Sequence, residues 1–535
     1  MEGVMTQQAC VISQLSIEFP QHSILKAQDL CLFAGQNSAL IGRNGQGKSV
    51  ILHYLQQQSS SATVQGQCIW QMPHAYLSQF QRLTGETLAQ AWGIDQFYQC
   101  FKRIEQGVAS EDDFSLVENH WHLPAQWQKM LEHAELNLSL DDSILHLSEG
   151  QKTKLALCAL FFLKDHYLLL DEPTNHLDQE ARAWLLECLT NHPAGSLMIS
   201  HDQNLLAHMQ HIYVLSGQHI QHYAGSYADY EQQNRLQTAA LQRTVDQEKL
   251  SLKQLKQQQH VTRAKAQKRQ QAGDKLRQRH SQAKILLDFK QNKAGQSLNR
   301  VAKQQERQLD MKQDQLAQHQ QQLEHVKPQR FELWNNVMQS GEILRVDQFT
   351  LPNAQHPAVS FALHAGEKLR IKGQNGTGKS YLLHTIQHNS QDHIFRKGRS
   401  FYLDQHLSVL NQQQSVLENL NALNPHLSDV QWRNLLGQLR LKGEKALLPI
   451  HQLSGGEQLK VALLAVSQCH ESPSLLLLDE PDNHLDLESK HVLAQALLNF
   501  TGSVLVVSHD AHFLQQAGIT QQYDLTTGKV EPMHF

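Results

Sequence analysis

The chain has 535 residues, more than one hydrophobic core organises, so its length predicts several structural units. Hydrophobic residues make up 40% and charged residues 18%, and no apolar run approaches the roughly 20 residues of a membrane-spanning helix. The formal net charge is −4, so no basic character of the chain as a whole points to nucleic acid. The N-terminal residues lack the pattern of a signal peptide, and seven scattered cysteines without a CxxC pair favour free thiols in a reducing compartment. We therefore expect a cytoplasmic protein without a membrane segment.

The same ordered set of five motifs occurs twice along the chain. The first copy has GRNGQGKS (42–49), YLSQ ending at Gln79, LSEGQ (147–151), LLLDEPTNHLD (168–178) and ISHD (199–202). The second copy has GQNGTGKS (373–380), YLDQ ending at Gln405, LSGGE (453–457), LLLLDEPDNHLD (475–486) and VSHD (507–510). The first copy carries about 20 more residues between its second and third motifs, which predicts a small helical insertion at about 82–140.

The first copy begins with a phosphate loop and continues to an acidic strand end. Glycines in GxxxxGK[ST] let several backbone N–H groups face one anion, and the following helix adds its N-terminal dipole. Lys48 is expected to reach the β- and γ-phosphates and Ser49 to ligate Mg²⁺. Asp171 ends an apolar strand and would also hold Mg²⁺, while Glu172 is the candidate general base. The candidate phosphate-loop ligands are Gly42, Arg43, Asn44, Gly45, Gln46, Gly47, Lys48 and Ser49.

A basic segment joins the two copies. Residues 235–330 hold 21 Lys or Arg and 8 Asp or Glu, and residues 260–300 hold 11 basic and 2 acidic side chains. Leu and Val at near-helical spacing predict two long antiparallel helices, the second of about 30 residues and roughly 45 Å. We expect the chain to reverse between Gly273 and Ser297, either near Gly273 or in FKQNKAGQS. The sign of the charge favours a polyphosphate partner such as RNA, and the alternative is a solvated spacer.

The second copy repeats the chemistry of the first. Lys379 and Ser380 match Lys48 and Ser49, Asp479 is the second candidate Mg²⁺ ligand, and Glu480 is the second candidate general base. Its phosphate-loop ligands are Gly373, Gln374, Asn375, Gly376, Thr377, Gly378, Lys379 and Ser380.

These motifs in this order resemble the ATP-binding cassette ATPases over residues of about 9–225 and 341–530. The resemblance implies a head-to-tail sandwich with two ATP molecules at the interface. One site would combine residues 42–49 with Ser454, Gly455 and Gly456, and the other residues 373–380 with Ser148 and Gly150. Gln79 and Gln405 would sense Mg²⁺ and water. His201 and His509 would bind the γ-phosphate. Phe19 and Phe349 could stack on adenine or be ordinary strand-end aromatics.

Two residues depart from the pattern of the family. Glu149 stands where the signature usually has its first glycine, and a carboxylate beside a triphosphate is unfavourable unless it points away. Asp482 replaces the usual threonine of DEPT. We expect both sites to bind and hydrolyse ATP, with rates that need not be equal.

Two cassettes on one chain, joined by a basic helical linker, resemble the ABC-F family of ribosome-acting ATPases. The implied fold is α/β, with two tandem P-loop ATPase domains (1–232 and 331–535) joined by an antiparallel helical hairpin (233–330). The implied partner is the ribosome, through ribosomal RNA and P-site tRNA near the peptidyl-transferase region. The chain would act as a monomer with its own cassettes paired. Members are translation factors or protect ribosomes from antibiotics. A DNA-repair ATPase and a subunit of a membrane transporter are the alternatives.

Overall fold

The computed structural model describes residues 7–19, 22–56, 63–78, 83–175, 177–278, 303–304, 306–320, 322–323, 340–352, 357–374, 376–388, 393–404, 407–441, 443–469, 473–483 and 485–533. The chain forms two compact units. The first unit comprises Met1–Tyr227 together with Gln329–Phe535, and the second comprises Ala228–Pro328. Among the described helices, none has the length and apolar character needed to span a membrane.

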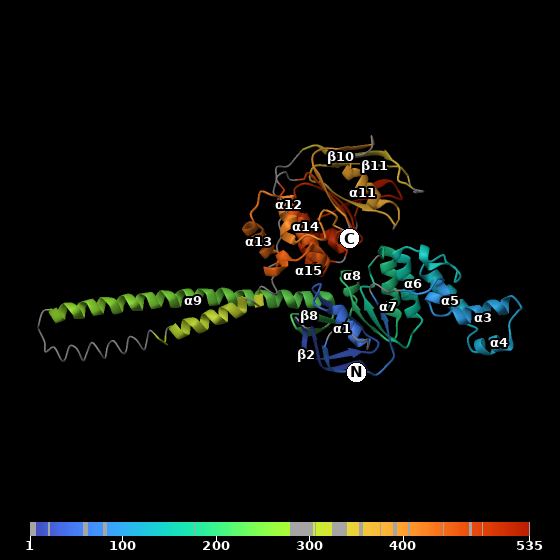
Figure 1. The fold of residues 1–535 in the computed structure, drawn as a ribbon, viewed down its shortest axis with the longest axis horizontal. Coiled ribbons are helices and arrows are strands. Elements are labelled where there is room, and N and C mark those ends of the chain that lie inside the picture. The colour runs from blue at the N-terminus through green and yellow to red at the C-terminus, as the bar shows by residue number, and fades with distance from the viewer. Residues whose placement is uncertain are drawn as a thin grey trace. The chain divides into compact units, whose positions relative to one another are not determined.

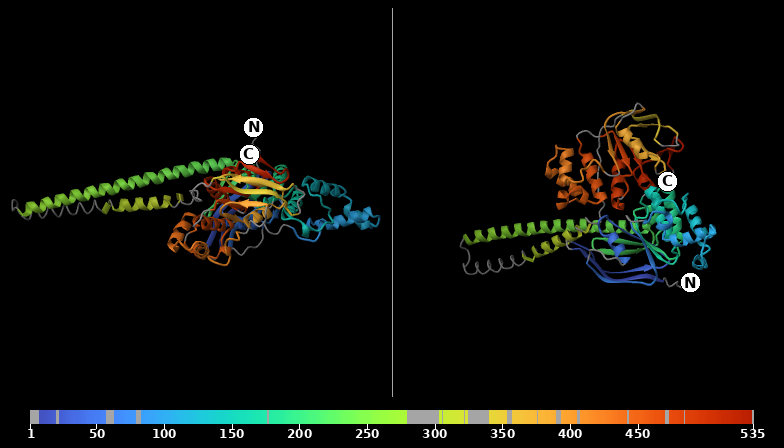
Figure 2. Two further views of the ribbon diagram at one scale, coloured as in Figure 1. Left: turned by 90° about the horizontal axis from the view of Figure 1, so that it is seen from above. Right: turned by 45° about the vertical axis from the view of Figure 1, so that its right-hand side comes forward.

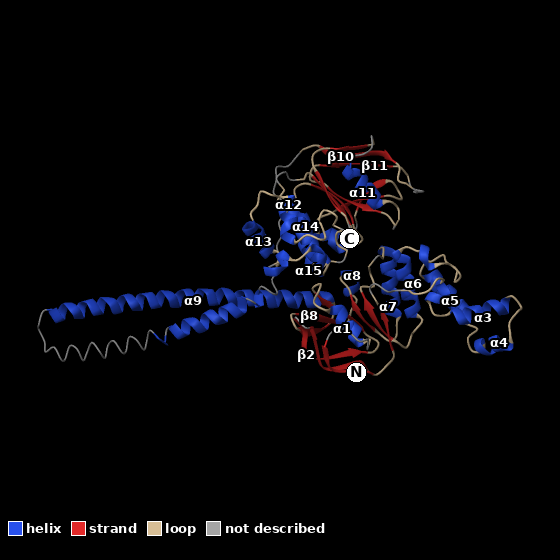
Figure 3. Ribbon diagram, viewed as in Figure 1, coloured by secondary structure: helices blue, strands red, loops and turns tan. Residues whose placement is uncertain are grey.

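Each copy of the repeat has one large and one small sheet within its described residues (Figure 3). The large sheet of the first copy has the order β5-β6-β7-β3-β8-β9, and its small antiparallel sheet has the order β2-β1-β4. These strands are β1 (Gln8–Phe19), β2 (His22–Phe33), β3 (Asn37–Gly42), β4 (Thr63–Trp70), β5 (His74–Leu77), β6 (Tyr167–Asp171), β7 (Ser196–Ile199), β8 (His211–Ser216) and β9 (His219–Ala224).

The second copy has the same topology strand for strand. Its sheets have the orders β14-β15-β16-β12-β17-β18 and β11-β10-β13. In both large sheets the first five strands pair in parallel and the last strand is antiparallel. The strands are β10 (Glu342–Phe349), β11 (Val359–His364), β12 (Lys368–Lys372), β13 (Ile394–Arg396), β14 (Ser400–Leu403), β15 (Leu475–Asp479), β16 (Ser503–Val507), β17 (Gln521–Asp524) and β18 (Lys529–Pro532).

Helices flank these sheets. The first copy contains α1 (Lys48–Leu55), α2 (Leu88–Ala91), α3 (Asp95–Glu105), α4 (Glu111–Val117), α5 (Leu123–His133), η1 (Ile144–His146), α6 (Glu149–Phe161), α7 (Gln179–Asn191) and α8 (Gln203–Leu206). The second copy contains α11 (Lys379–His388), α12 (Val416–Leu423), α13 (Asp429–Gln438), η2 (Gly443–Leu447), η3 (Ile450–Gln452), α14 (Gly455–Ser467), α15 (Leu487–Asn499) and α16 (Ala511–Gln516).

The central strands are buried on both faces, which their unbroken leucine runs predict. In β15, Leu476 and Leu478 pack in one core with helices α12 to α16, whereas Leu475 and Leu477 pack in another with the small sheet and α11. Alternate residues of a strand point to opposite faces, so the large sheet is the middle layer of the copy. This arrangement brings the carboxyl ends of the parallel strands to one edge, where the motif residues follow.

The insertion of the first copy lies inside a matching pair of bridges. Thr87 pairs with Ser143 in the first copy, and Ser415 pairs with Pro449 in the second. The longer interval of the first copy contains α3, α4 and α5, and an ion pair of Arg103 with Asp113 joins α3 to α4. The extra residues of the first copy therefore fall within a local helical region that leaves the shared sheet intact.

The second unit contains one very long helix. α9 (Tyr227–Gln278) has 52 residues, which corresponds to about 78 Å (Figure 1). Helical residues between 303 and 323 run beside it, as both views of Figure 2 show. The Lys312 ammonium donates to the Ser251 hydroxyl over 3.1 Å, and His319 Nδ1 lies 2.9 Å from Glu248 Oε1, so the two segments are antiparallel.

The helix continues through Gly273 to Gln278, so the chain does not reverse at that glycine itself. One glycine destabilises a helix by about 1 kcal/mol, and the surrounding Gln, Lys, Ala and Leu outweigh it. The other expected place, FKQNKAGQS, lies outside the described residues. The domain boundaries at 232/233 and 330/331 stay predictions.

Candidate active sites

Both phosphate loops join a central strand to a helix. The first runs from β3 to α1 and the second from β12 to α11. Gly47 and Gly378 directly precede the helices with φ of 93° and 92°, a left-handed conformation that favours glycine. A Cβ at Gly47 would lie 2.6 Å from Ile24 Cγ2, so a side chain there also meets a steric clash. The glycines of each phosphate loop therefore allow an anion-facing turn at the N-terminus of the following helix.

The two phosphate-loop lysines fold over their own loops. Lys48 Nζ donates to the carbonyls of Gly42 (2.8 Å) and Arg43 (3.0 Å). Lys379 Nζ makes the same contacts with Gly373 (2.7 Å) and Gln374 (2.9 Å). Both lysines are buried, and this burial lowers the pKa of each ammonium despite nearby carboxylates. A polyphosphate would supply the opposite charge that these cations need.

Asp171 and Asp479 are the last residues of β6 and β15, and both are buried. In the second copy the Ser380 side chain hydrogen-bonds to Asp479, and the Tyr402 hydroxyl donates to Asp479 Oδ2 over 3.3 Å. Burial raises the pKa of Asp479. A hydroxyl and a carboxylate side by side form the oxygen donor set that Mg²⁺ takes alongside phosphates, so these residues fit the ion.

Glu172 and Glu480 have unusual backbone conformations. Their φ values are 50° and 47°, in the left-handed region that glutamate rarely occupies. In each case the backbone N–H donates to the last residue of the neighbouring strand, Ile199 (3.0 Å) or Val507 (2.9 Å). Burial and the charge of Asp479 raise the pKa of Glu480. The same strain at equivalent positions points to a functional constraint on the glutamates.

The histidines that follow β7 and β16 face these glutamates. His201 Nε2 lies 3.2 Å from Glu172 Oε1, and His509 Nε2 lies 4.0 Å from Glu480 Oε1. Burial lowers the pKa of His201 well below its usual value, and the nearby Lys48 charge adds to this. Burial likewise lowers the pKa of His509 to about 3. Both rings are therefore neutral at physiological pH and can offer one N–H donor each.

The signature serines lie at the N-termini of long helices. The Ser148 hydroxyl accepts from the Gln151 N–H (3.2 Å) and caps α6, while the Ser454 hydroxyl donates to Glu457 at the start of α14 (3.0 Å). Glu149, the unusual residue of the first signature, is exposed and pairs with Lys152 at 3.0 Å. Its carboxylate is thus held by a cation of its own helix.

The structure brings the first phosphate loop against the second copy. The Asn44 N–H donates to Asp486 Oδ2 over 3.0 Å. Arg43 Nε lies 2.6 Å from Glu488 Oε2, and Arg440 Nη1 lies 2.9 Å from Glu488 Oε1. The pairing of loop and signature in each site stays a prediction.

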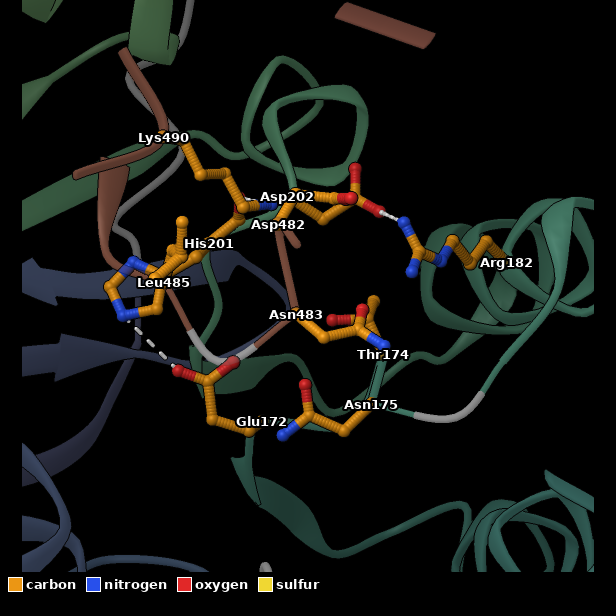
Figure 4. A pocket seen from close by; sticks show the side chains of 10 residues that line it. All are labelled: Glu172, Thr174, Asn175, Arg182, His201, Asp202, Asp482, Asn483, Leu485 and Lys490. Carbon is orange, nitrogen blue, oxygen red and sulfur yellow. Dashed lines mark hydrogen bonds and ion pairs between the residues drawn. The ribbon is translucent and has the colours of Figure 1, made fainter. Parts of the chain in front are cut away.

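Residues lining the interface pocket come from both copies (Figure 4). Glu172, His201 and Asp202 contribute from the first copy, and Asp482, Asn483 and Lys490 from the second. The residues that cross between copies were missed by sequence reasoning. The HLD sequence before α15 marks Asp486 as a helix cap, but no local pattern shows that it also faces the other copy.

Several predicted site residues need separate mention. Gln79, Gln405 and Asn375 lie outside the described residues. Phe349 is 1% exposed and packs in the hydrophobic core, so the structure does not support it as an adenine platform. For a large apolar ring, burial in the core is more favourable than exposure to water at a strand end. Phe19 is partly buried against the core of the first copy, and its adenine contact stays a prediction.

Comparison with known proteins gives relatives over nearly the whole chain. A model of the ABC transporter family matches residues 25–175 and 357–483. The putative ATP-binding protein YdiF of Bacillus subtilis is 29% identical over 97% of this chain and 80% of its own length. The probable ATP-binding protein YheS of Escherichia coli K12 is 27% identical over 98% and 79%. ATP-binding cassette sub-family F member 3 of Mus musculus is 27% identical over 94% and 69%.

Solved structures share the fold. The crystal structure of archaeal ribosome recycling factor aABCE1 with ribosomal stalk protein aP1 gives a TM-score of 0.51 at 16% identity, covering 92% of this chain and 83% of that one. A structure of RNase-L inhibitor gives 0.52 at 15% identity, with the same coverage. The repeated fold and motifs thus define a P-loop ATPase with two tandem nucleotide-binding domains. The chain belongs to the ATP-binding cassette family, in its ABC-F branch.

Proposed function

We propose that this ATPase acts on the ribosome in the cytoplasm, and that ATP-dependent pairing of its two copies sets the position of the basic linker. The observation that carries the proposal is the charge of the linker: 21 basic against 8 acidic residues over 235–330, in a chain whose net charge is −4. A long helix such as α9 presents that charge along its length. Counterion release then favours a polyphosphate surface such as ribosomal RNA.

In the proposed hydrolysis step, each copy acts through the residues at its strand ends. Lys48 and Lys379 bind phosphate oxygens, and Glu172 and Glu480 orient the attacking water. Asp479 and Ser380 would hold Mg²⁺ in the second site, and Asp171 and Ser49 in the first; the ion neutralises phosphate charge when bound. His201 and His509, kept neutral by burial, would donate to the γ-phosphate.

The comparisons support a role in translation without defining it. The structural neighbour described as a ribosome recycling factor was crystallised with a ribosomal stalk protein, and the relatives are named as ATP-binding proteins. We propose contact with ribosomal RNA and P-site tRNA through residues 233–330, by a single chain whose domains are 1–232 and 331–535. The task would be either translation itself or protection from an antibiotic.

The test is sedimentation with ribosomes in the presence of ATP. The double variant Glu172→Gln/Glu480→Gln should bind ATP, fail to hydrolyse it and accumulate on ribosomes, because the closed form persists. A Lys48→Ala/Lys379→Ala variant, which should not bind ATP, is the matched control and should remain in the supernatant. The proposal is contradicted if both variants sediment with ribosomes to the same extent, or if neither variant sediments with them.

A second variant set tests the linker. Replacing Lys265, Lys268 and Lys275 by Gln should weaken ribosome binding and flatten its dependence on salt by about 0.7–0.9 per lost phosphate contact. Replacing three exposed lysines outside the linker (Lys129, Lys164 and Lys529) is the control. Unchanged ribosome binding with the linker variant contradicts the proposal. Tighter binding to branched DNA than to ribosomal RNA would favour DNA repair instead.

A further inference from the structure

Two pairs of equivalent positions in the pocket between the copies hold different residues. The switch histidines His201 and His509 are 308 residues apart, and the same separation relates Arg182 to Lys490 and Thr174 to Asp482. All the residues of the last two pairs line or border this pocket, as Figure 4 shows. The two copies therefore contribute different side chains to the pocket, although these side chains come from equivalent segments of the repeat.

Lys490 bridges the two copies. Its ammonium donates to Asp510 Oδ2 over 2.7 Å within the second copy, and to the backbone carbonyl of His201 in the first copy over 3.0 Å. Its side chain is only 12% exposed. Burial acts to lower the pKa of Lys490, but the charges of Asp510 and Asp482 outweigh it and raise the pKa. The ammonium therefore stays charged where it meets the switch histidine.

Arg182, the equivalent residue, makes two side-chain hydrogen bonds, and both lie within the first copy. Its guanidinium donates to Asp202 Oδ2 over 3.0 Å and to the Leu177 carbonyl over 3.0 Å. Two cations thus hold the segment at His201. Arg182 of the same copy binds Asp202, and Lys490 of the other copy binds the His201 carbonyl. The segment at His509 is held by two cations of its own copy, Lys490 at Asp510 and Arg370, whose Nε donates to the Ser508 carbonyl over 3.0 Å.

We propose that Lys490 is a positioning residue for the first ATP site, which acts across the interface by holding the His201 backbone. The His201 ring lies 3.2 Å from Glu172, the candidate general base, so a displaced carbonyl moves the group that faces the reacting water. Lys490 also binds Asp510, which directly follows His509. One side chain therefore links the switch segments of the two sites.

Asp482 lines the same pocket as the buried lysine. It stands where the first copy has Thr174, is 3% exposed, and its charge acts on Lys490. With Asp510 it offsets the burial of the ammonium. The aspartate of DEPD thus adds a negative charge to the pocket in which Lys490 reaches the other copy.

The inference rests on the proposed roles of His201 and Glu172, and the experiment separates the two. Steady-state hydrolysis by the full chain is measured in a Glu480→Gln background, so that turnover reports on the first site. Adding Lys490→Met should lower kcat about tenfold and leave KM for ATP within about twofold, because geometry changes more than binding. Adding Lys490→Arg should restore most of the turnover, whereas Lys164→Met, an exposed control, should change nothing.

Removing a buried lysine also leaves carboxylates unpaired, so stability is followed in parallel. Lys490→Met/Asp482→Thr removes a charge of each sign, and it should recover Tm without recovering kcat. Recovery of both would show that Lys490 serves only charge balance and would overturn the inference. If Glu172→Gln in the same background left turnover intact, the assignment of the first site itself would be wrong. If Glu172→Gln abolished turnover and Lys490→Met did not reduce it, only the positioning role would fail.

Discussion

The ion pair between Arg43 and Glu488 predicts a difference between the two ATP sites. Arg43 belongs to the first phosphate loop and Glu488 to α15 of the second copy, with 2.6 Å between Nε and Oε2. The equivalent positions are Gln374 and Glu180, which cannot form an ion pair. Glu488→Gln should therefore weaken closure at the first site, and Glu180→Gln should not weaken it at the second.

The size of the effect follows from exposure. The side chains of Arg43 and Glu488 are 34% and 21% exposed, so the pair is partly screened by water. Such pairs are worth about 0.5–1 kcal/mol, which corresponds to about a two- to fivefold change in apparent ATP affinity. Arg440 also binds Glu488 and holds its carboxylate in place, so the pair forms with little loss of side-chain freedom.

The assay is a double-mutant cycle of Arg43→Gln and Glu488→Gln, with KM for ATP measured at low ionic strength. The coupling energy should be about 0.5–1 kcal/mol and should fall towards zero near 1 M salt, where the screening length is about 3 Å. A coupling of zero at low salt, or an equal change in KM with Glu180→Gln, would refute the reasoning.

Two further predictions concern chemistry and backbone geometry. In a Glu172→Gln background, kcat should fall as the pH decreases, with a midpoint above the usual pKa range of glutamate. Burial raises the pKa of Glu480, and its protonated form cannot accept a proton. A pH profile of kcat without this fall at acid pH would speak against Glu480 as the base. Gly47→Ala should abolish ATP binding at the first site, so that calorimetry detects one bound ATP in place of two, because the new Cβ meets Ile24 in a left-handed backbone. Gly107→Ala, with a φ of 72° and open space around it, should lower Tm and leave ATP binding at both sites intact.

Much of the fold was predictable from local signals. The leucine runs before Asp171 and Asp479 gave two fully buried strands, because a strand covered on both faces needs apolar residues throughout. The duplicated motifs predicted two similar domains. The single glycine in α9 was less informative, since one weak helix former does not end a helix rich in strong ones.

The site was predictable where a residue acts through its own loop, and not where it acts across the copies. The phosphate-loop lysines and the strand-end carboxylates follow from motif spacing. The contacts of Arg43 with Glu488 and of Lys490 with His201 join residues hundreds of positions apart, and their registry depends on how two domains meet. For Phe349, burial of the ring in the core favours an ordinary strand-end aromatic, an alternative that the spacing left open.

The left-handed backbone at Glu172 and Glu480 lowers the stability of the fold at the two residues that are proposed for catalysis. Such a conformation is unfavourable by roughly 1–2 kcal/mol for a residue with a Cβ and nearly free of strain for glycine. Glycine at either position should therefore yield an inactive protein that melts at a higher temperature than the native one. Selection for turnover, acting against thermal robustness, would then be what keeps glutamate at both strand ends.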